Sequence, residues 1–227
     1  MENGTLYIIA SPIGNLEDIT YRAINILRDK TDYVYCEDTR RTRKLLNHYN
    51  IKIPTQSLQN YSSNAKINRT VKILMDGKSI SYLTDSGTPG LSDPGSKLVQ
   101  YARQEGIPII PIPGPSSLTS IISISGFASN NIIFTGFLSK KEGKKKRELE
   151  KLKVLNGVIV IFESPYRIKK LIKVLYEIFP DSEIIIAREM TKVFEEFITG
   201  SMIDIYNNIE NIKELGEFTV AIMNKKR

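Results

Sequence analysis

The sequence predicts an α/β fold, because short apolar segments alternate with helical segments along the whole chain. Two kinds of segment support this prediction. Residues 5–10 and 157–162 are short, apolar and rich in Ile and Val, as buried strands are. Residues 64–78 carry Ile67, Val71 and Leu74 at helical spacing before Gly77 ends the pattern. A length of 227 residues suits one large domain or two small ones.

The first half of the chain is predicted to contain four strands, each followed by a helical or loop segment. The strands are expected at 5–10, 32–37, 79–84 and 107–112, and the helices at 20–28, 41–49, 64–78 and 92–106. Ser92 is placed at the N-cap of the last of these helices and Gly106 at its C-terminus. Strands separated by helices of this length indicate parallel βαβ units.

The second half repeats the alternation after the turn PGPSS (113–117), so we assign the domains to 1–113 and 114–227. Ser164 and Pro165 are expected at the N-cap and first position of a helix that ends near Phe179. Strands are expected at 132–137, 157–162, 183–189, 195–200 and 216–223, with a further helix at 202–209.

The composition is that of a globular protein with 41% hydrophobic residues and a net charge of +7. Such a charge favours polyanionic partners and equally fits a general requirement for solubility. The single cysteine, Cys36, cannot form an internal disulfide, which favours a reducing compartment such as the cytoplasm. The N-terminus lacks the features of a signal peptide, and no apolar stretch approaches the ~18 residues of a membrane-spanning helix.

Four of the predicted strands end in loops rich in Gly, Pro and hydroxyl side chains. The loops are SPIGN (11–15), EDTRRT (37–42), DSGTPG (85–90) and PGPSS (113–117). In an open parallel sheet, ligands bind beyond the carboxyl ends of the strands, where these four loops would gather. Glycines in such loops allow a close approach of the backbone to a ligand. The four loops together predict a binding site, although each alone is also compatible with an ordinary turn.

Several other kinds of site are not supported by the sequence. Asp85-Ser86-Gly87-Thr88 is like one half of an aspartic protease site, but a second such loop is missing and the chain is not all-β. Neither a GxxxxGK[ST] segment nor a GxGxxG segment after the first strand is present. The single histidine, His48, and Cys36 do not have the spacing of zinc ligands, so we expect no metal site.

Eight motifs in order resemble one known family. They are SPIGNL, CEDTRRT, LTDSGTPGLSDPG, PIPGPSS, TGFL, FESPYR, AREMTK and GEF, and they extend over essentially the whole chain. The chain is similar to the ribosomal RNA small subunit methyltransferase I family of the tetrapyrrole methylase superfamily. The resemblance implies two α/β domains with S-adenosylmethionine bound in a cleft between them. It also implies a cytoplasmic homodimer that 2′-O-methylates the ribose of a cytidine in 16S rRNA. A small-molecule (tetrapyrrole-type) methyltransferase of the same fold and a non-catalytic RNA-binding factor are the alternatives.

The resemblance also implies which residues bind the cofactor. In the first domain they are Pro12, Gly14, Asp85, Ser86, Gly87, Thr88 and Leu91, and around the next turn they are Ser116 and Ser117. In the second domain, Glu163 and Met190 are expected beside the adenosine. Asp85 has two possible roles, as an acceptor for the ligand or as a cap of its own turn.

Methyl transfer to a ribose hydroxyl needs a group that accepts the hydroxyl proton. We expect this group in the EDTRRT loop, where Glu37, Asp38 and Arg40 are the candidate catalytic residues, although simple pairing of the acids with nearby arginines is an alternative. Asn15 and Asn60 are candidates for orienting the ribose, and Tyr61 and Tyr166 for stacking on a base, with simple packing as the alternative for both tyrosines. Phosphate contacts are expected from KKEGKKKR (140–147), which could instead be a solvated, mobile linker. The arginines of 40–43 and the cluster Arg167, Lys169 and Lys170 are expected to add further phosphate contacts. Many family members carry a further helical segment after the last strand, and any RNA contact made by that segment is expected to be absent here or supplied elsewhere.

Overall fold

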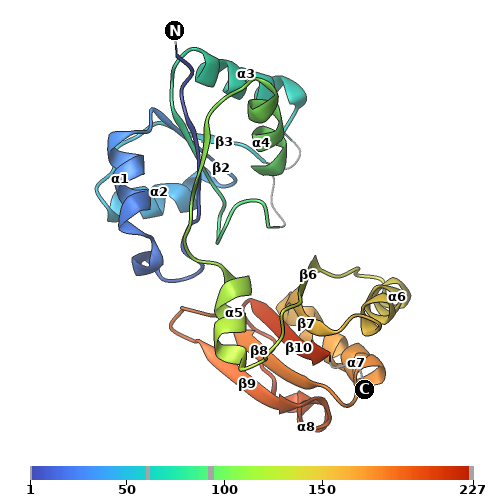
Figure 1. Cartoon of the computed structure of the whole chain (residues 1–227). Coiled ribbons are helices and arrows are strands. Elements are labelled where there is room, and N and C mark those ends of the chain that lie inside the picture. Colours follow the sequence, from blue (N-terminus) through green and yellow to red (C-terminus); the bar gives the residue numbers. More distant parts are fainter. Residues whose placement is uncertain (1, 60–61, 92–94, 225–227) are drawn as a thin grey trace. The chain divides into compact units, whose positions relative to one another are not determined.

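The computed structural model describes residues 2–59, 62–91 and 95–224 (Figure 1). The chain divides into two compact units, Met1–Ser116 and Ser117–Arg227, and each unit contains helices and a five-stranded sheet. The predicted α/β fold with two sheets is therefore confirmed. Three residues to which the sequence gave roles, namely Asn60, Tyr61 and Ser92, lie outside the described residues.

The first unit is a parallel α/β sheet with the strand order β3-β2-β4-β1-β5. Each described strand pair in it is parallel. The strands are β1 (Leu6–Ile9), β2 (Tyr33–Cys36), β3 (Thr55–Ser57), β4 (Ile80–Leu83) and β5 (Ile109–Ile112), and the helices are α1 (Tyr21–Asp29), α2 (Thr39–His48), α3 (Asn64–Met75) and α4 (Gly95–Gln104), with a 3-10 turn at Leu16–Asp18. The sequence did not predict β3, which is short and polar and therefore lacks the apolar pattern of a buried strand.

Helices cover both faces of this sheet. Neighbouring residues of β2 show this, because they point to opposite faces and pack against different helices. Val34 packs in a core with Leu45 and Leu46 of α2 and with the buried residues of α1. Tyr35, the next residue of β2, packs in a second core with residues of α3 and α4, among them Leu74 and Leu98. Because these strands are parallel, the carboxyl ends of β1, β2, β4 and β5 lie along one edge of the sheet, and the four predicted loops gather there.

The second unit contains a mixed sheet with the order β6-β7-β10-β8-β9. Its strands are β6 (Ile132–Phe137), β7 (Gly157–Glu163), β8 (Glu183–Arg188), β9 (Glu196–Ser201) and β10 (Phe218–Asn224), and its helices are α5 (Ser117–Ser125), α6 (Glu142–Lys153), α7 (Ile168–Ile178) and α8 (Met202–Asn207), with 3-10 turns at Pro165–Arg167 and Ile209–Asn211. The pair β6–β7 is parallel, whereas β10 is antiparallel to β7 and β8, and β8 is antiparallel to β9.

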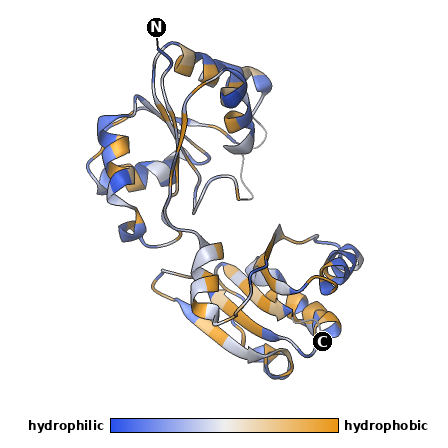
Figure 2. Ribbon diagram, viewed as in Figure 1, coloured by the Kyte–Doolittle hydropathy of each residue, from blue (hydrophilic) through white to orange (hydrophobic). Residues whose placement is uncertain are grey.

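The prediction of parallel βαβ units is thus correct for the first unit and wrong for most of the second. The physical reason is the connection between β8 and β9, which is too short for a crossover and can join only antiparallel neighbours. Figure 2 shows the hydrophobic residues of this unit concentrated in the strands. The apolar face of α7 packs on them through Ile168, Leu171 and Leu175, which are fully buried.

Candidate active site

The DSGTPG loop after β4 is joined to the SPIGN loop after β1 by paired backbone hydrogen bonds. The Ser11 amide donates to the Gly87 carbonyl over 2.9 Å, and the Gly87 amide donates to the Ser11 carbonyl over 3.0 Å. The Ser11 hydroxyl also donates to the Thr84 carbonyl (2.9 Å), and the Thr84 hydroxyl donates to the Gly87 carbonyl (3.1 Å). Gly87 has a φ of +80°, which a residue with a side chain adopts only under strain. Gly87 therefore fixes the loop, and sequence analysis gave no role to its partners Ser11 and Thr84.

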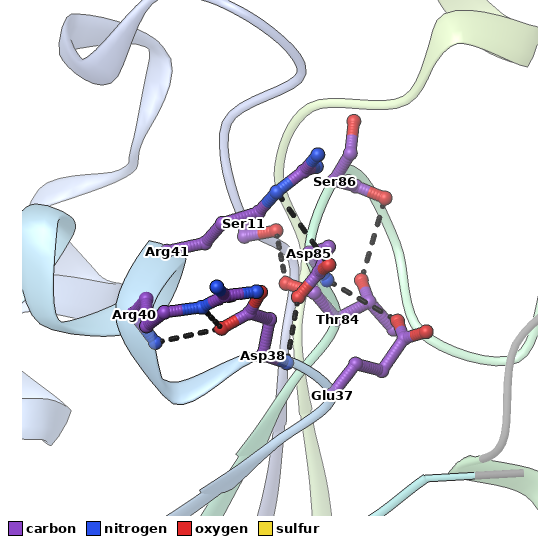
Figure 3. A network of polar contacts seen from close by, with 8 residues as sticks. All are labelled: Ser11, Glu37, Asp38, Arg40, Arg41, Thr84, Asp85 and Ser86. Atoms are coloured by element: carbon purple, nitrogen blue, oxygen red, sulfur yellow. Dashed lines mark hydrogen bonds and ion pairs between the residues drawn. The ribbon is translucent and has the colours of Figure 1, made fainter.

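The same loop is joined to the EDTRRT loop after β2 by two reciprocal hydrogen bonds (Figure 3). The Asp38 amide donates to Asp85 Oδ1 over 2.9 Å, and the Asp85 amide donates to Glu37 Oε1 over 3.2 Å. Arg41 Nε lies 3.7 Å from Asp85 Oδ2. Each loop thus supplies a carboxylate to an amide of the other. In this arrangement Asp85 braces the two loops, which goes beyond capping its own turn.

The turn after β5 is joined to the same loop. The Thr88 hydroxyl donates to the Pro115 carbonyl over 3.1 Å. At Gly114 an added Cβ would lie 3.0 Å from Ala10 Cβ, so the backbone of this turn passes close to the end of β1. All four loops predicted at this edge are therefore brought together, with DSGTPG contacting each of the other three.

Asp38 and Arg40 form a local pair at the start of α2. The Asp38 side chain is the N-cap of this helix and accepts the Arg40 amide over 2.8 Å. The Arg40 guanidinium also contacts both carboxylate oxygens of Asp38, at 2.7 Å for the shortest contact. Hydrogen bonds from the Arg40 side chain and amide lower the pKa of Asp38 to about 2. A carboxylate with so low a pKa is a poor proton acceptor, so Glu37 is the better candidate of the two.

The remaining cofactor candidates of the first unit lie along the same edge. Gly14 and Ser86 are exposed, and Pro12 and Leu91 are half-buried. Gly90 has a φ of +95°, a conformation that favours glycine, and an added Cβ there would meet no atom of the described residues within 4 Å. Exposed backbone and hydroxyl groups beside the Asp85 carboxylate suit the amino acid end of S-adenosylmethionine, which is zwitterionic. Ser116 is buried at the end of this unit, and Ser117 begins α5 in the second unit.

In the second unit, Glu163 lies at the end of β7 with its side chain fully buried among cations. Its Oε2 lies 3.5 Å from Lys145 Nζ, and its Oε1 pairs with Arg167 and accepts the Ser164 amide over 2.8 Å. Ser164 and Pro165 occupy the N-cap and first position as predicted, at the 3-10 turn Pro165–Arg167 that leads into α7. The Ser164 hydroxyl makes no capping bond and instead accepts a hydrogen bond from Arg167 Nε. The Glu163 carboxylate thus has a structural role, and its expected contact with adenosine stays a prediction.

The basic run 140–147 is not a mobile linker, because most of it lies in α6. Lys145 is 4% exposed and faces Glu163, and Lys146 Nζ lies 2.6 Å from Glu177 Oε2. Lys144 also lies 3.9 Å from Glu148, so three of its six basic side chains have acidic partners within the unit. Glu163 and Glu177 lie outside the helix, so a local pattern did not reveal their pairing with the run.

Met190 is held in a strained turn directly after β8. It is 8% exposed and lies between Glu189 (φ 52°) and Thr191 (φ 65°), both in the left-handed region. Such strain persists only where surrounding contacts fix it, and it is frequent at functional sites. The position is consistent with the predicted ligand contact of Met190, which stays a prediction.

The turn at Glu189 should make stability depend on pH. Burial disfavours the charged form of Glu189, but hydrogen bonds from Lys192 Nζ and the Glu217 amide, both 2.8 Å, lower its pKa overall. A lowered pKa stabilises the fold above the unfolded-state pKa of ~4.3, and this contribution is lost as the pH falls through the folded-state value. Denaturant unfolding should therefore find Glu189→Gln less stable than the unmodified protein at pH 7, and the difference in stability should shrink as the pH falls below the unfolded-state pKa. A difference that does not change with pH would contradict this assignment.

Neither a membrane span nor a metal centre is found in the part of the chain that the structure describes. None of its helices combines the length and apolarity that crossing a bilayer requires. No group of three or more His, Cys, Asp or Glu side chains in residues 2–59, 62–91 and 95–224 is arranged to hold a metal ion.

Comparison with known proteins decides the family. The model of the tetrapyrrole (corrin/porphyrin) methylases matches residues 5–205. A protein of Leptospira biflexa named ribosomal RNA small subunit methyltransferase I is 42% identical over 100% of this chain and 93% of its own length. A protein of the same name from Thermotoga maritima is 45% identical over 98% of this chain and 100% of its own length. The chain belongs to the ribosomal RNA small subunit methyltransferase I family. This family is one of methyltransferases, as the eight motifs predicted.

Solved structures show that the family shares its fold with enzymes of other substrates. A diphthine synthase matches with a TM-score of 0.72 at 12% identity, covering 98% of this chain and 90% of that chain. A uroporphyrin-III C-methyltransferase of Thermus thermophilus, solved with S-adenosylhomocysteine, matches with a TM-score of 0.65 at 14% identity, covering 96% of this chain and 97% of that chain. At such identities the likeness concerns the fold alone, so a tetrapyrrole substrate is not favoured.

Proposed function

We propose that this protein transfers a methyl group from S-adenosylmethionine to the ribose 2′-oxygen of a cytidine in 16S rRNA of the small ribosomal subunit. It does so in the cytoplasm as a homodimer. The observation that carries the proposal is the membership of the whole chain in the ribosomal RNA small subunit methyltransferase I family. The four loops at one edge of the first sheet supply a site of the expected kind.

The residues of this edge divide the work of binding and catalysis. Exposed backbone at Gly14 and Gly90 and the hydroxyl of Ser86 bind the polar end of the cofactor. When bound, S-adenosylmethionine supplies an electrophilic methyl group on a positively charged sulfur. Holding two reactants in the correct geometry is worth about 7–11 kcal/mol of the barrier, and the joined loops provide the rigid frame for it.

Glu37 accepts the proton that the 2′-hydroxyl loses as its oxygen bonds to the methyl carbon. The hydrogen bond from the Asp85 amide fixes its Oε1 in place. Asp38 instead holds the start of α2 through its bonds to Arg40. The reaction needs no metal ion, because the leaving sulfur becomes neutral when the methyl group departs.

The proposal is tested with radiolabelled S-adenosylmethionine and two acceptors, small ribosomal subunits that lack the modification and a tetrapyrrole. Label should enter the rRNA and not the tetrapyrrole. Label in the tetrapyrrole alone would establish the alternative of a small-molecule methyltransferase. Cofactor binding is measured separately by calorimetry. If the protein binds S-adenosylmethionine but no label enters the rRNA, the assigned substrate is rejected.

A further inference from the structure

The excess positive charge of this protein lies in a single segment. Residues 39–75 contain eight Lys or Arg and no Asp or Glu, and we call them the acid-free segment. The rest of the chain then holds 24 of the 32 Lys or Arg against all 25 Asp or Glu, a net charge of −1. The segment was not predicted as a feature, because its basic residues are more widely spaced than those of the run at 140–147.

Two basic side chains of the acid-free segment converge on the edge strand β3. This strand is the last in the order of the first sheet, so one side of it has no described strand as a neighbour. Arg43 of α2 donates from Nε to the Thr55 hydroxyl over 3.1 Å. Lys66 of α3 donates from Nζ to the Ser57 hydroxyl over 3.2 Å. The two helices, α2 and α3, pack on opposite faces of the sheet (Figure 1). Cations from helices on both faces therefore meet at this strand.

These cations are oriented without being neutralised. The groups that hold Arg43 and Lys66 are neutral hydroxyls, and within the described residues neither side chain makes an ion pair. Arg69 lies three residues after Lys66, so it shares one side of α3 with it, and it is exposed. In the second unit, by contrast, many basic side chains lie against carboxylates, including Lys145, Lys146, Arg167, Lys169, Arg188 and Lys192.

We propose that Arg43, Thr55, Ser57, Lys66 and Arg69, which we name the β3 surface, bind the phosphates of single-stranded RNA in the substrate. This proposal rests on the proposed function and assigns the RNA to a particular surface. Arg and Lys provide the charge that displaces counterions from the nucleic acid. Ser and Thr hydroxyls are common phosphate contacts that position the strand without reading its sequence.

Two further features favour RNA as the occupant. A membrane surface would need large apolar side chains for insertion, and Met75 is the one exposed large hydrophobic residue among those described in the acid-free segment. In addition, α2 begins at Thr39, two residues after Glu37, so the helix that carries Arg43 starts at the candidate catalytic loop. RNA on the β3 surface would therefore adjoin the reacting group.

The test compares two triple variants that each remove three exposed or half-exposed positive charges from the first unit. One is Arg43→Gln/Lys66→Gln/Arg69→Gln, and the matched control is Arg22→Gln/Lys97→Gln/Arg103→Gln, in α1 and α4. Binding of a fluorescein-labelled, mixed-sequence RNA of about 20 nucleotides is measured by anisotropy between 50 and 200 mM salt. The β3-surface variant should bind about 10–100-fold more weakly, with a salt slope reduced by about 2, since each phosphate contact to a single strand contributes ~0.7.

The control variant should bind the RNA as the unmodified protein does, and both variants should keep the affinity for S-adenosylmethionine. RNA binding unchanged in the β3-surface variant, or an equal loss in both variants, would overturn the proposal. Binding to phosphatidylserine vesicles and to an acidic protein is measured with the same variants. If the β3-surface variant lost binding to one of these and kept its affinity for RNA, the proposal would also be overturned. Methyl transfer by the unmodified protein is measured in parallel, because its absence rejects the proposed function whatever the RNA affinities are.

Discussion

Replacing Glu37 by Gln is expected to slow methyl transfer at saturating substrates by about 10²–10⁴-fold, the usual contribution of a positioned general base. Glutamine keeps the carbonyl oxygen that accepts the Asp85 amide, so the brace between the two loops should survive. The variant loses only the capacity to take up a proton. The affinity for S-adenosylmethionine, measured by calorimetry, should therefore change little while kcat falls.

Asp38→Asn is the matched control for Glu37→Gln. Asparagine is also a good N-cap, so α2 should still begin at the same residue. The pKa of Asp38 is lowered to about 2 by Arg40, and its loss as a base should matter little, with a change in kcat below about 10-fold. If Asp38→Asn lost activity and Glu37→Gln kept it, the proton acceptor would have been assigned to the wrong neighbour.

Glu163→Ala is expected to lower the free energy of unfolding by about 3–5 kcal/mol, the usual cost of removing one partner from a buried ion pair. The Glu163 side chain is fully buried, and its removal would leave the ammonium of Lys145, itself 4% exposed, without its carboxylate. The Arg167 guanidinium would lose the same partner. Denaturant unfolding of the complete chain, monitored in both units, measures the loss.

Glu177→Ala provides the comparison, because Glu177 of α7 pairs with Lys146, the residue next to Lys145 in α6. Glu177 pairs with Lys146 over 2.6 Å, but both side chains are partly exposed, and such pairs contribute about 0–1 kcal/mol. Lys145→Met should fall between the two variants, because Glu163 would keep Arg167 as a partner. If Glu163→Ala and Glu177→Ala lowered the free energy of unfolding equally, the buried cluster would contribute no more to stability than the exposed pair.

The parts of the fold that sequence predicted are those with a strong local pattern. β1, β2 and β4 are buried apolar strands, and α3 and α7 carry clear apolar stripes. β3 was missed because an edge strand of three residues needs no apolar side chains. The antiparallel placement of β10 between β7 and β8 also lay beyond the local pattern, because pairing partners distant in sequence determine it.

The candidate site shows the same division between local and distant information. The sequence predicted that four loops gather at one edge of a parallel sheet, because each loop follows a strand. The parallel pairing of these strands confirms this prediction. The bonds that join the loops, such as Ser11 to Gly87 and Asp38 to Asp85, connect residues more than 40 positions apart. Lys145 and Glu163 are closer in the sequence, but their contact joins α6 to the end of β7 and is likewise not visible in a local pattern. The acid-free segment, by contrast, can be found in the sequence itself by counting acids as well as bases, although it was not among the predicted features.

The position of the transferred methyl group tests the central claim most directly. Small ribosomal subunits that lack the modification are incubated with the protein and radiolabelled S-adenosylmethionine, and the rRNA is then hydrolysed in alkali. Alkaline cleavage uses the 2′-hydroxyl as its nucleophile, so a 2′-O-methyl group blocks it. We predict that the label appears in an alkali-resistant dinucleotide whose 5′ nucleoside is cytidine. Label released in single nucleotides, which marks a methylated base, would contradict the account.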